Sequence, residues 1–337
     1  MLNKAYIDLR VLEQNALKIK KALPKGVSFN AVVKANAYGH GLVEVANAIY
    51  RIADSFSVAL IEEGVKLRLA GIKKEILILI PPLKEELEVA IEHGFTISVD
   101  RLEKLEQVIF VSKKLKRGVS GHIKVNTGMN RLGLDIKDLK KVFERAKNTL
   151  VKIDGIFSHL AYPEREKQTK SQVNKFLLAK SVAKSYNNKI RAHLSASGGF
   201  LKGYYFDMVR IGILLYGYTP FESGEVKVKP IMKIYSPIIA KRKLKKGEQI
   251  LYGNKKLKEN KSVTLVRVGY ADGFLRKEDD SLFNNRCMDL SAYKSVKKRG
   301  EYAVVLDNAK ELALATKTIS YEVLTKCAIR AQKIYLK

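Results

Sequence analysis

The chain has 337 residues, of which 46% are hydrophobic and 29% charged, which is ordinary for a globular protein and long enough for a barrel with an additional domain. No apolar run approaches the roughly 18 residues that a membrane-spanning helix needs, and the amino terminus lacks a signal-peptide pattern, so we expect no membrane partner. The net charge of +29 comes mainly from lysines spread through almost every predicted helix, without the interleaved aromatic residues that stack on bases, so we expect no nucleic-acid partner.

Eight short apolar or β-branched segments alternate with helical patterns over the first two thirds of the chain. The predicted strands cover residues 28–33, 55–60, 75–80, 95–99, 119–125, 151–159, 189–195 and 207–213. Apolar residues spaced at i, i+3 and i+4 predict helices over residues 12–22, 42–52, 62–70, 84–92, 102–115, 139–147 and 168–186. This alternation predicts an α/β fold whose N-terminal domain is a (β/α)8 TIM barrel.

The sequence pattern changes near Val226, where the helical spacing of apolar residues ends and runs that are typical of strands begin. We expect these strands over residues 231–240, 249–252, 262–269, 302–306 and 328–336. The predicted domains are therefore an N-terminal strand at residues 1–10 that pairs with the C-terminal domain, a barrel over residues 11–225, and a mainly β C-terminal domain over residues 226–337.

Lys34 directly follows the first predicted strand and precedes a turn that contains Gly39 and Gly41. Active sites of such barrels lie at the carboxyl ends of the strands. Partial burial there disfavours the ammonium form and lowers the pKa of a lysine, which leaves a free amine that can condense with an aldehyde cofactor. A single lysine at a strand end is more often a solvated one, so the case for a Schiff-base lysine depends on the surrounding motif.

Other reactive side chains follow the later strands. Arg131 follows the fifth strand, His159 ends the sixth, Ser197 follows the seventh and Arg210 lies in the eighth. The loops after strands seven and eight, which carry Ser197 and Gly212, have the small residues that let backbone amides approach a phosphate group.

The segment over residues 32–41, VVKANAYGHG, resembles the cofactor signature of alanine racemases, and the resemblance extends over nearly the full chain. It implies that Lys34 binds pyridoxal 5'-phosphate covalently and that Tyr38 supports the phosphate. The cofactor-binding residues that the resemblance implies are Lys34, Tyr38, His159, Ser197, Arg210, Gly212, Ile213 and Tyr321.

The segment over residues 207–213 matches the last barrel strand of that family, in which an arginine contacts the pyridine nitrogen, and this arginine corresponds to Arg210. A cation beside that nitrogen keeps it unprotonated, weakens the ring as an electron sink and limits the lifetime of a carbanionic intermediate. Related barrel decarboxylases place a carboxylate there, so Arg210 favours a racemase.

Racemisation removes a proton from one face of Cα and returns a proton to the other face, so it needs two bases. Lys34 supplies one of them. The segment over residues 267–273, RVGYADG, matches the family motif that carries the other, which makes Tyr270 the second catalytic residue. A hydrogen-bonded chain through His159 toward Arg210 would favour its ionised form. In the family this tyrosine belongs to the partner subunit, so the resemblance implies a homodimer with shared active sites.

The resemblance also implies a substrate site. Arg131 resembles the arginine that reads the substrate carboxylate, and Met288 and Asp289 match residues that shape the same site. Tyr321 matches a tyrosine that closes over the cofactor. Lys124 matches a lysine that can be carbamylated and so orient Arg131.

Three features depart from the family pattern. Ala196 stands where an asparagine usually precedes the phosphate-binding serine, Asn126 replaces a common aspartate, and the segment after Leu306 is short. The first departure is expected to weaken cofactor retention.

The residues and the resemblance together predict a pyridoxal-phosphate-dependent alanine racemase, an isomerase that interconverts L-alanine and D-alanine and supplies D-alanine for peptidoglycan. Two alternatives remain open, a broad-specificity amino-acid racemase and a pyridoxal-phosphate-dependent barrel decarboxylase. The two cysteines, Cys287 and Cys327, lie far apart and outside any CxxC pattern, so we expect no disulfide, no metal site and a cytoplasmic location.

Overall fold

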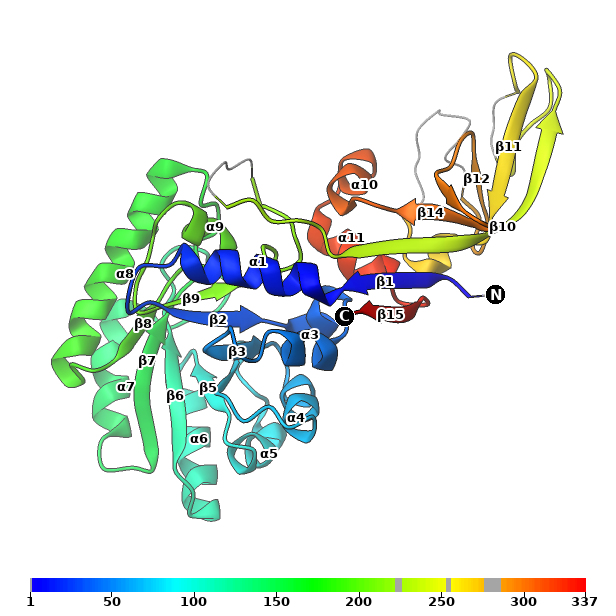
Figure 1. The fold of residues 1–337 in the computed structure, drawn as a ribbon. Coiled ribbons are helices and arrows are strands. Elements are labelled where there is room, and N and C mark those ends of the chain that lie inside the picture. The colour runs from blue at the N-terminus through cyan, green and yellow to red at the C-terminus, as the bar shows by residue number, and fades with distance from the viewer. Residues whose placement is uncertain (1, 222–225, 253–255, 276–285) are drawn as a thin grey trace. The chain divides into compact units, whose positions relative to one another are not determined.

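The computed structural model describes residues 2–221, 226–252, 256–275 and 286–337 (Figure 1). The chain forms two compact units. The barrel unit consists of Glu13–Ala35 and Leu42–Val228, and the C-terminal unit consists of Met1–Leu12, Asn36–Gly41 and Lys229–Lys337.

The barrel unit is built on one sheet of eight parallel strands. They are β2 (Ser28–Val32), β3 (Ser55–Val58), β4 (Ile76–Ile78), β5 (Thr96–Val99), β6 (Val119–Lys124), β7 (Val151–Phe157), β8 (Arg191–His193) and β9 (Met208–Ile211). The strands pair in the order β8-β7-β6-β5-β4-β3-β2-β9. The amides of Asp207 and Arg210 donate to the carbonyls of Ala192 and Ser195, at 3.0 and 2.9 Å, and so connect the two ends of this order. The predicted barrel is confirmed, with every predicted strand in place.

The helices that alternate with these strands lie outside the sheet (Figure 1). They are α1 (Leu9–Lys21), α3 (Leu42–Ala48), α4 (Ile61–Leu69), α5 (Leu87–Glu92), α6 (Leu102–Leu115), α7 (Leu139–Ala146), α8 (Glu166–Tyr186) and α9 (Ser197–Leu201), with the short 3-10 helices η1 (Lys84–Glu86) and η2 (Ile136–Asp138). In α7 the buried residues are Leu139, Val142, Phe143 and Ala146, which is the predicted stripe.

Two helix boundaries differ from the prediction. The helix predicted from Leu12 begins at Leu9, because the Asp8 carboxylate accepts hydrogen bonds from the amides of Arg10 and Val11. The helix predicted to continue to Ile52 ends at Ala48.

The C-terminal unit is mainly β. Its strands are β1 (Lys4–Asp8), β10 (Met232–Leu244), β11 (Lys261–Val266), β12 (Ser291–Tyr293), β13 (Lys298–Arg299), β14 (Tyr302–Leu306) and β15 (Gln332–Leu336). The first strand, β1, pairs antiparallel with β10 and parallel with β15. This unit also holds the 3-10 helix η3 (Tyr270–Asp272) and two helices, α10 (Ala309–Ala315) and α11 (Ser320–Cys327).

Two expectations for the C-terminal unit are wrong. Residues 249–252 form no strand, because Leu251 has a positive φ of 48° and Ile250 instead packs into a small core with Leu257 and Val263. Helical structure also continues beyond residue 226. The sequence pattern does not predict the two short helices, because each has only about two turns, too few for an apolar stripe to repeat. The Asn308 side chain nevertheless caps α10 by accepting from the Lys310 amide.

No helix in the described part of the chain is long and apolar enough to cross a membrane.

Candidate active site

Lys34 begins the short helix α2 (Lys34–Tyr38), two residues beyond the end of strand β2, and its side chain is partly buried. Burial lowers the pKa of Lys34 below its ordinary value, and the positive charge of Arg131 lowers it further, while Glu63 acts in the opposite direction. The Glu63 carboxylate also accepts hydrogen bonds from the amides of Ala35 and Ala59, at 2.5 and 2.9 Å, which fixes the backbone directly after the lysine. The predicted nucleophilic amine therefore has a physical basis in its surroundings.

The backbone after Lys34 has an uncommon conformation. All four residues from Ala35 to Tyr38 have φ between 52° and 53°, so α2 is a turn of left-handed helix. Each non-glycine residue in that conformation costs roughly 1–2 kcal/mol, and such strain is concentrated at functional sites. The sequence predicted a glycine-containing turn here but not this conformation, because only Asn36 among the four favours it.

Tyr38 is buried at the end of this turn, within the C-terminal unit. Its ring lies 5.9 Å from the ring of Tyr321, measured between centroids. Burial raises the pKa of Tyr321 to about 12 and raises the pKa of Tyr38 further. Both phenols therefore stay protonated at neutral pH and keep an O–H group that can donate a hydrogen bond.

Gly39 also belongs to this unit, and a Cβ on it would lie 2.4 Å from the carbonyl oxygen of Leu324 in α11. The close approach of the left-handed turn to the helix that carries Tyr321 requires glycine at this position.

Arg210, in strand β9, is only 3% exposed. Its guanidinium donates to Nδ1 of His193 at 2.6 Å, to the carbonyl of His193 at 2.9 Å, and to the carbonyls of Ser158 and Leu194 at 2.6 and 3.1 Å. Burial lowers the pKa of Arg210 to about 9, which leaves the side chain cationic at neutral pH. No hydrogen bond joins Arg210 to the His159 side chain among the described residues, so the expected chain through His159 stays a prediction.

Lys124 ends strand β6, where its side chain is 8% exposed. Burial, together with the charges of Arg131 and Arg210, lowers the pKa of Lys124 to about 8, while Asp100 acts in the opposite direction. Its ammonium lies 5.6 Å from the centre of the Phe157 ring, and the Arg210 guanidinium lies 5.3 Å from the same centre. Two cations thus share one aromatic ring inside the barrel.

His159 lies just beyond strand β7 and is partly buried. Burial and the charges of Arg210, Arg131, Lys34 and Lys124 together lower the pKa of His159 to about 3, and burial has the largest effect. The imidazole is therefore neutral, and it shares one electrostatic environment with these four cations. The structure brings together five of the predicted site residues at the carboxyl ends of the strands.

Ser197 begins helix α9, and its side chain is buried. Its hydroxyl oxygen accepts from the amide of Gly212 at 3.2 Å and, more weakly, from the amide of Leu214 at 3.5 Å. The two loops that were predicted to hold a phosphate therefore meet at Ser197, and they bring backbone amides with them.

Tyr270, Met288 and Asp289 belong to the C-terminal unit. The amides of Tyr270 and Ala271 donate to the carbonyls of Cys287 and Met288, at 3.2 and 3.0 Å, so the two predicted segments lie side by side. A Cβ on Gly269 would lie 2.1 Å from the Met288 carbonyl oxygen, which explains the glycine. The side chains of Tyr270 and Met288 are 44% and 55% exposed.

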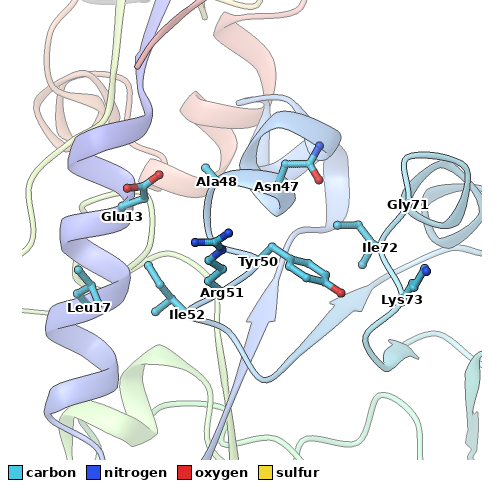
Figure 2. Close-up of a pocket in the computed structure, with 10 residues that line it drawn as sticks. All are labelled: Glu13, Leu17, Asn47, Ala48, Tyr50, Arg51, Ile52, Gly71, Ile72 and Lys73. Atoms are coloured by element: carbon cyan, nitrogen blue, oxygen red, sulfur yellow. The ribbon is translucent and has the colours of Figure 1, made fainter.

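The pocket drawn in Figure 2 lies elsewhere in the barrel unit. It has a volume of about 820 Å³ and is lined by residues that include Glu13, Leu17, Tyr50, Arg51 and Lys73. Its loops precede strands β3 and β4, so it lies at the amino ends of the strands, where barrel residues serve stability rather than chemistry.

Comparison with known proteins decides the family. Models of the alanine racemase N-terminal and C-terminal domains match residues 7–220 and 231–335. The chain belongs to the alanine racemase family. It is 30% identical to an alanine racemase of Aquifex aeolicus, over 96% of this chain and 98% of that protein, and 31% identical to one of Clostridium tetani, over 99% and 95%.

A solved structure of the alanine racemase of Clostridium difficile 630 has a TM-score of 0.91 and 28% sequence identity, and the match covers 100% of this chain and 96% of that one. The family and its solved structures confirm the predicted fold class and the predicted reaction. The protein is an isomerase that interconverts L-alanine and D-alanine.

One departure from the alanine racemase pattern has a structural explanation. The Asn126 carbonyl oxygen accepts from the amides of Gly128 and Asn130, both at 3.1 Å, and its amide donates to the Asn130 side chain at 3.0 Å. An aspartate could accept the two amides but could not donate, so asparagine supports the loop that carries Arg131 at least as well. At the other departure, Ala196 offers no side-chain cap to helix α9.

Sequence reasoning missed two residues of this alanine racemase-family site. Glu63 supports the turn after Lys34, and His193 bonds directly to Arg210. The position of His193 in the sequence could have indicated its role. It lies in a short strand, RAH, and inward positions of barrel strands are ordinarily aliphatic.

Proposed function

We propose that this enzyme racemises alanine with pyridoxal 5'-phosphate held at the carboxyl ends of the barrel strands, with Lys34 and Tyr270 as the two bases. The observation that carries the proposal is the gathering of Lys34, Lys124, Arg131 and Arg210 around a neutral His159. A phosphorylated aldehyde and an amino-acid carboxylate are anions, and such a concentration of cations favours both.

The described residues fit the cofactor. Lys34 supplies an amine with a lowered pKa, and condensation with an aldehyde requires the neutral form of such an amine. Ser197 and the amides of Gly212 and Ile213 would hold the phosphate, and Tyr38 would add a phenol donor. When bound, the cofactor withdraws electrons from Cα of the substrate and so makes its proton acidic.

Arg210 would face the ring nitrogen of the cofactor. An arginine has only donors and retains its proton at neutral pH, so it cannot supply an acceptor or a negative charge that would keep that nitrogen protonated. This limits the electron withdrawal to what a reversible proton exchange needs, and it disfavours the decarboxylase alternative.

Arg131 would bind the substrate carboxylate, because its exposed guanidinium can form two parallel hydrogen bonds to it. Lys124 is suited to carbamylation, since its pKa of about 8 leaves a fraction of neutral amine at neutral pH. A carbamate there would be an anion that orients Arg131. Tyr321 would close over the cofactor.

The second base would come from the partner subunit of a homodimer. Tyr270 and Met288 are more exposed than large apolar side chains usually are, and Asp289 lies beside them. Burial against the active site of a second copy would explain this exposure. Met288 and Asp289 would then complete the carboxylate site.

We place the enzyme in the cytoplasm, because its two cysteines lie in no disulfide pattern. Its D-alanine would supply peptidoglycan synthesis.

The reaction is tested by incubating the purified protein and pyridoxal phosphate with a panel of L-amino acids and separating the products by chiral chromatography. We expect D-alanine from the native protein and none from Lys34→Ala. Formation of D-isomers from many amino acids at similar rates would indicate a broad-specificity racemase instead. An amine product, or no product, would contradict the proposal.

The shared site is tested by subunit complementation. Lys34→Ala and Tyr270→Phe homodimers are both expected to be inactive. Refolding them as a mixture gives heterodimers with one intact site, so activity should return to roughly one quarter of the native value. If both bases came from one chain, the mixture would stay inactive.

A further inference from the structure

The interior of the barrel contains a continuous hydrogen-bonded chain of ionisable side chains. Arg210 Nη1 donates to Nδ1 of His193 at 2.6 Å, His193 Nε2 lies 2.9 Å from Nδ1 of His122, and His122 Nε2 lies 3.4 Å from an oxygen of Asp154. Both histidine side chains are fully buried. Layers of aliphatic side chains usually fill this space, so the chain replaces part of an ordinary core.

The backbone is shaped to hold this chain. The pairing of β6 with β7 shifts register between Gly121 and His122, which leaves Asp154 as an extra, bulged residue beside the imidazole. A Cβ on Gly155, which pairs with His122, would lie 2.2 Å from that ring, so only glycine leaves room for it.

The hydrogen-bond directions follow from Arg210, because a guanidinium has donors and no acceptor. Nδ1 of His193 must therefore accept, which places the proton of that ring on Nε2, where it is donated to His122. Nδ1 of His122 accepts it, so the proton of His122 is on Nε2, which lies 3.4 Å from the Asp154 carboxylate and 3.3 Å from Nη2 of Arg191. Of these two neighbours only the carboxylate can accept that proton, because the guanidinium has no acceptor. With the opposite tautomers, two N–H groups of His193 and Arg210 would face each other at 2.6 Å.

We propose that His193 and His122 are positioning residues, which hold the Arg210 guanidinium in one orientation through neutral imidazoles of fixed tautomer, anchored at the far end by Asp154. The proposal rests on the proposed function, in which Arg210 meets the cofactor nitrogen. Burial and the charge of Arg210 also keep the His193 pKa well below its ordinary value, which maintains a neutral ring.

The use of imidazoles has a chemical consequence. A carboxylate bonded directly to Arg210 would cancel much of its charge at the position where the cofactor needs it. A neutral imidazole accepts the same hydrogen bond and leaves the charge in place. The carboxylates of Asp154 and Glu75 are kept beyond both rings, and Glu75 is paired there with Arg191.

The first test needs no cofactor. In the native apo protein labelled with ¹⁵N-histidine, imidazole ¹⁵N spectra at pH 7 should show His193 and His122 as neutral rings protonated on Nε2. Protonation of His193 on Nδ1, or an imidazolium at either position, would overturn the proposal.

The second test uses the enzyme loaded with pyridoxal phosphate. His193→Leu removes the acceptor and should lower kcat at least about tenfold, while KM for alanine and the dissociation constant of the cofactor change by less than about threefold. His193→Gln restores an acceptor for Arg210 and should recover most of kcat. Ser120→Ala is the matched control, because the Ser120 hydroxyl donates to Asp154 at 2.7 Å but lies outside the chain.

A native kcat in His193→Leu, or equal losses in His193→Leu and Ser120→Ala, would overturn the positioning role. If His193→Leu does not fold, the comparison of His193→Gln with Ser120→Ala and the apo spectra still decide it. If the native protein neither binds the cofactor nor racemises alanine, the proposed function fails, and the ¹⁵N spectra then decide the tautomers alone.

Discussion

The two ends of the barrel interior differ in whether their charged side chains are paired. At the amino ends of the strands, Arg191 and Glu75 form a bidentate ion pair with both distances at 2.8 Å. At the carboxyl ends, Lys34, Lys124 and Arg210 form no ion pair among the described residues, and Arg131 adds a fourth cation. Paired charges hold the fold together, whereas a group of like charges opposes folding and needs another reason to exist. We infer that the unpaired cations are there to bind anions.

The largest effect is expected at Lys34, where function and stability should separate. Lys34→Ala should reduce alanine racemisation by at least about 10³-fold, because it removes both the cofactor attachment and one base. Removal of a partly buried ammonium should leave the apo protein as stable as before or more so. Chiral chromatography measures the racemase activity, and urea unfolding measures the stability of the apo protein. A large loss of stability would mean that the carboxyl end is structural after all.

At the amino ends of the strands we expect the opposite, a loss of stability with activity retained. Burial alone would raise the pKa of Glu75, but hydrogen bonds and the charge of Arg191 outweigh it and hold the pKa below its ordinary value. Glu75→Gln should therefore cost about 2 kcal/mol of unfolding free energy, less than for a fully buried pair because both side chains are partly exposed. Activity of the folded protein should stay within about threefold of the native value.

A matched control for this variant is Glu166→Gln, which breaks the surface pair between Glu166 and Lys170. No measurable change in the urea midpoint is expected there. Equal effects of the two variants would show that the amino-end pair contributes no more than a surface contact.

At Lys124 the expected effect on stability has the opposite sign from that at Glu75, and it has a defined pH dependence. The folded-state pKa of about 8 lies below the ordinary 10.5, so the native protein binds this proton less tightly than the unfolded chain does. The resulting destabilisation is complete below pH 8 and disappears as the pH rises toward 10.5. Lys124→Met should thus stabilise the apo protein by about 3 kcal/mol at pH 7 and much less at pH 10.

Urea unfolding of Lys124→Met and the native protein at both pH values tests this expectation. A variant that is less stable than the native protein at pH 7 would show that the Lys124 charge is compensated in the fold.

The sequence predicted the parts of the molecule that depend on local patterns. Strand and helix positions follow from apolar periodicity, and Lys34 and Arg210 follow from motifs at strand ends. The left-handed turn from Ala35 to Tyr38 was not predicted, because its conformation is imposed by contacts such as that of Gly39 with Leu324, which lies far along the chain. The bond between Arg210 and His193 was missed for a related reason, since it joins inward positions of two strands.

The most direct test of the account is to identify the lysine that carries the cofactor. The protein loaded with pyridoxal phosphate is reduced with borohydride, which makes the link permanent, then digested and analysed by mass spectrometry, with Lys34→Ala treated in parallel. We expect the cofactor mass on the peptide that contains Lys34 and on no other, and no stoichiometric label in the variant. Label on another lysine, or equal label in native protein and variant, would contradict the account.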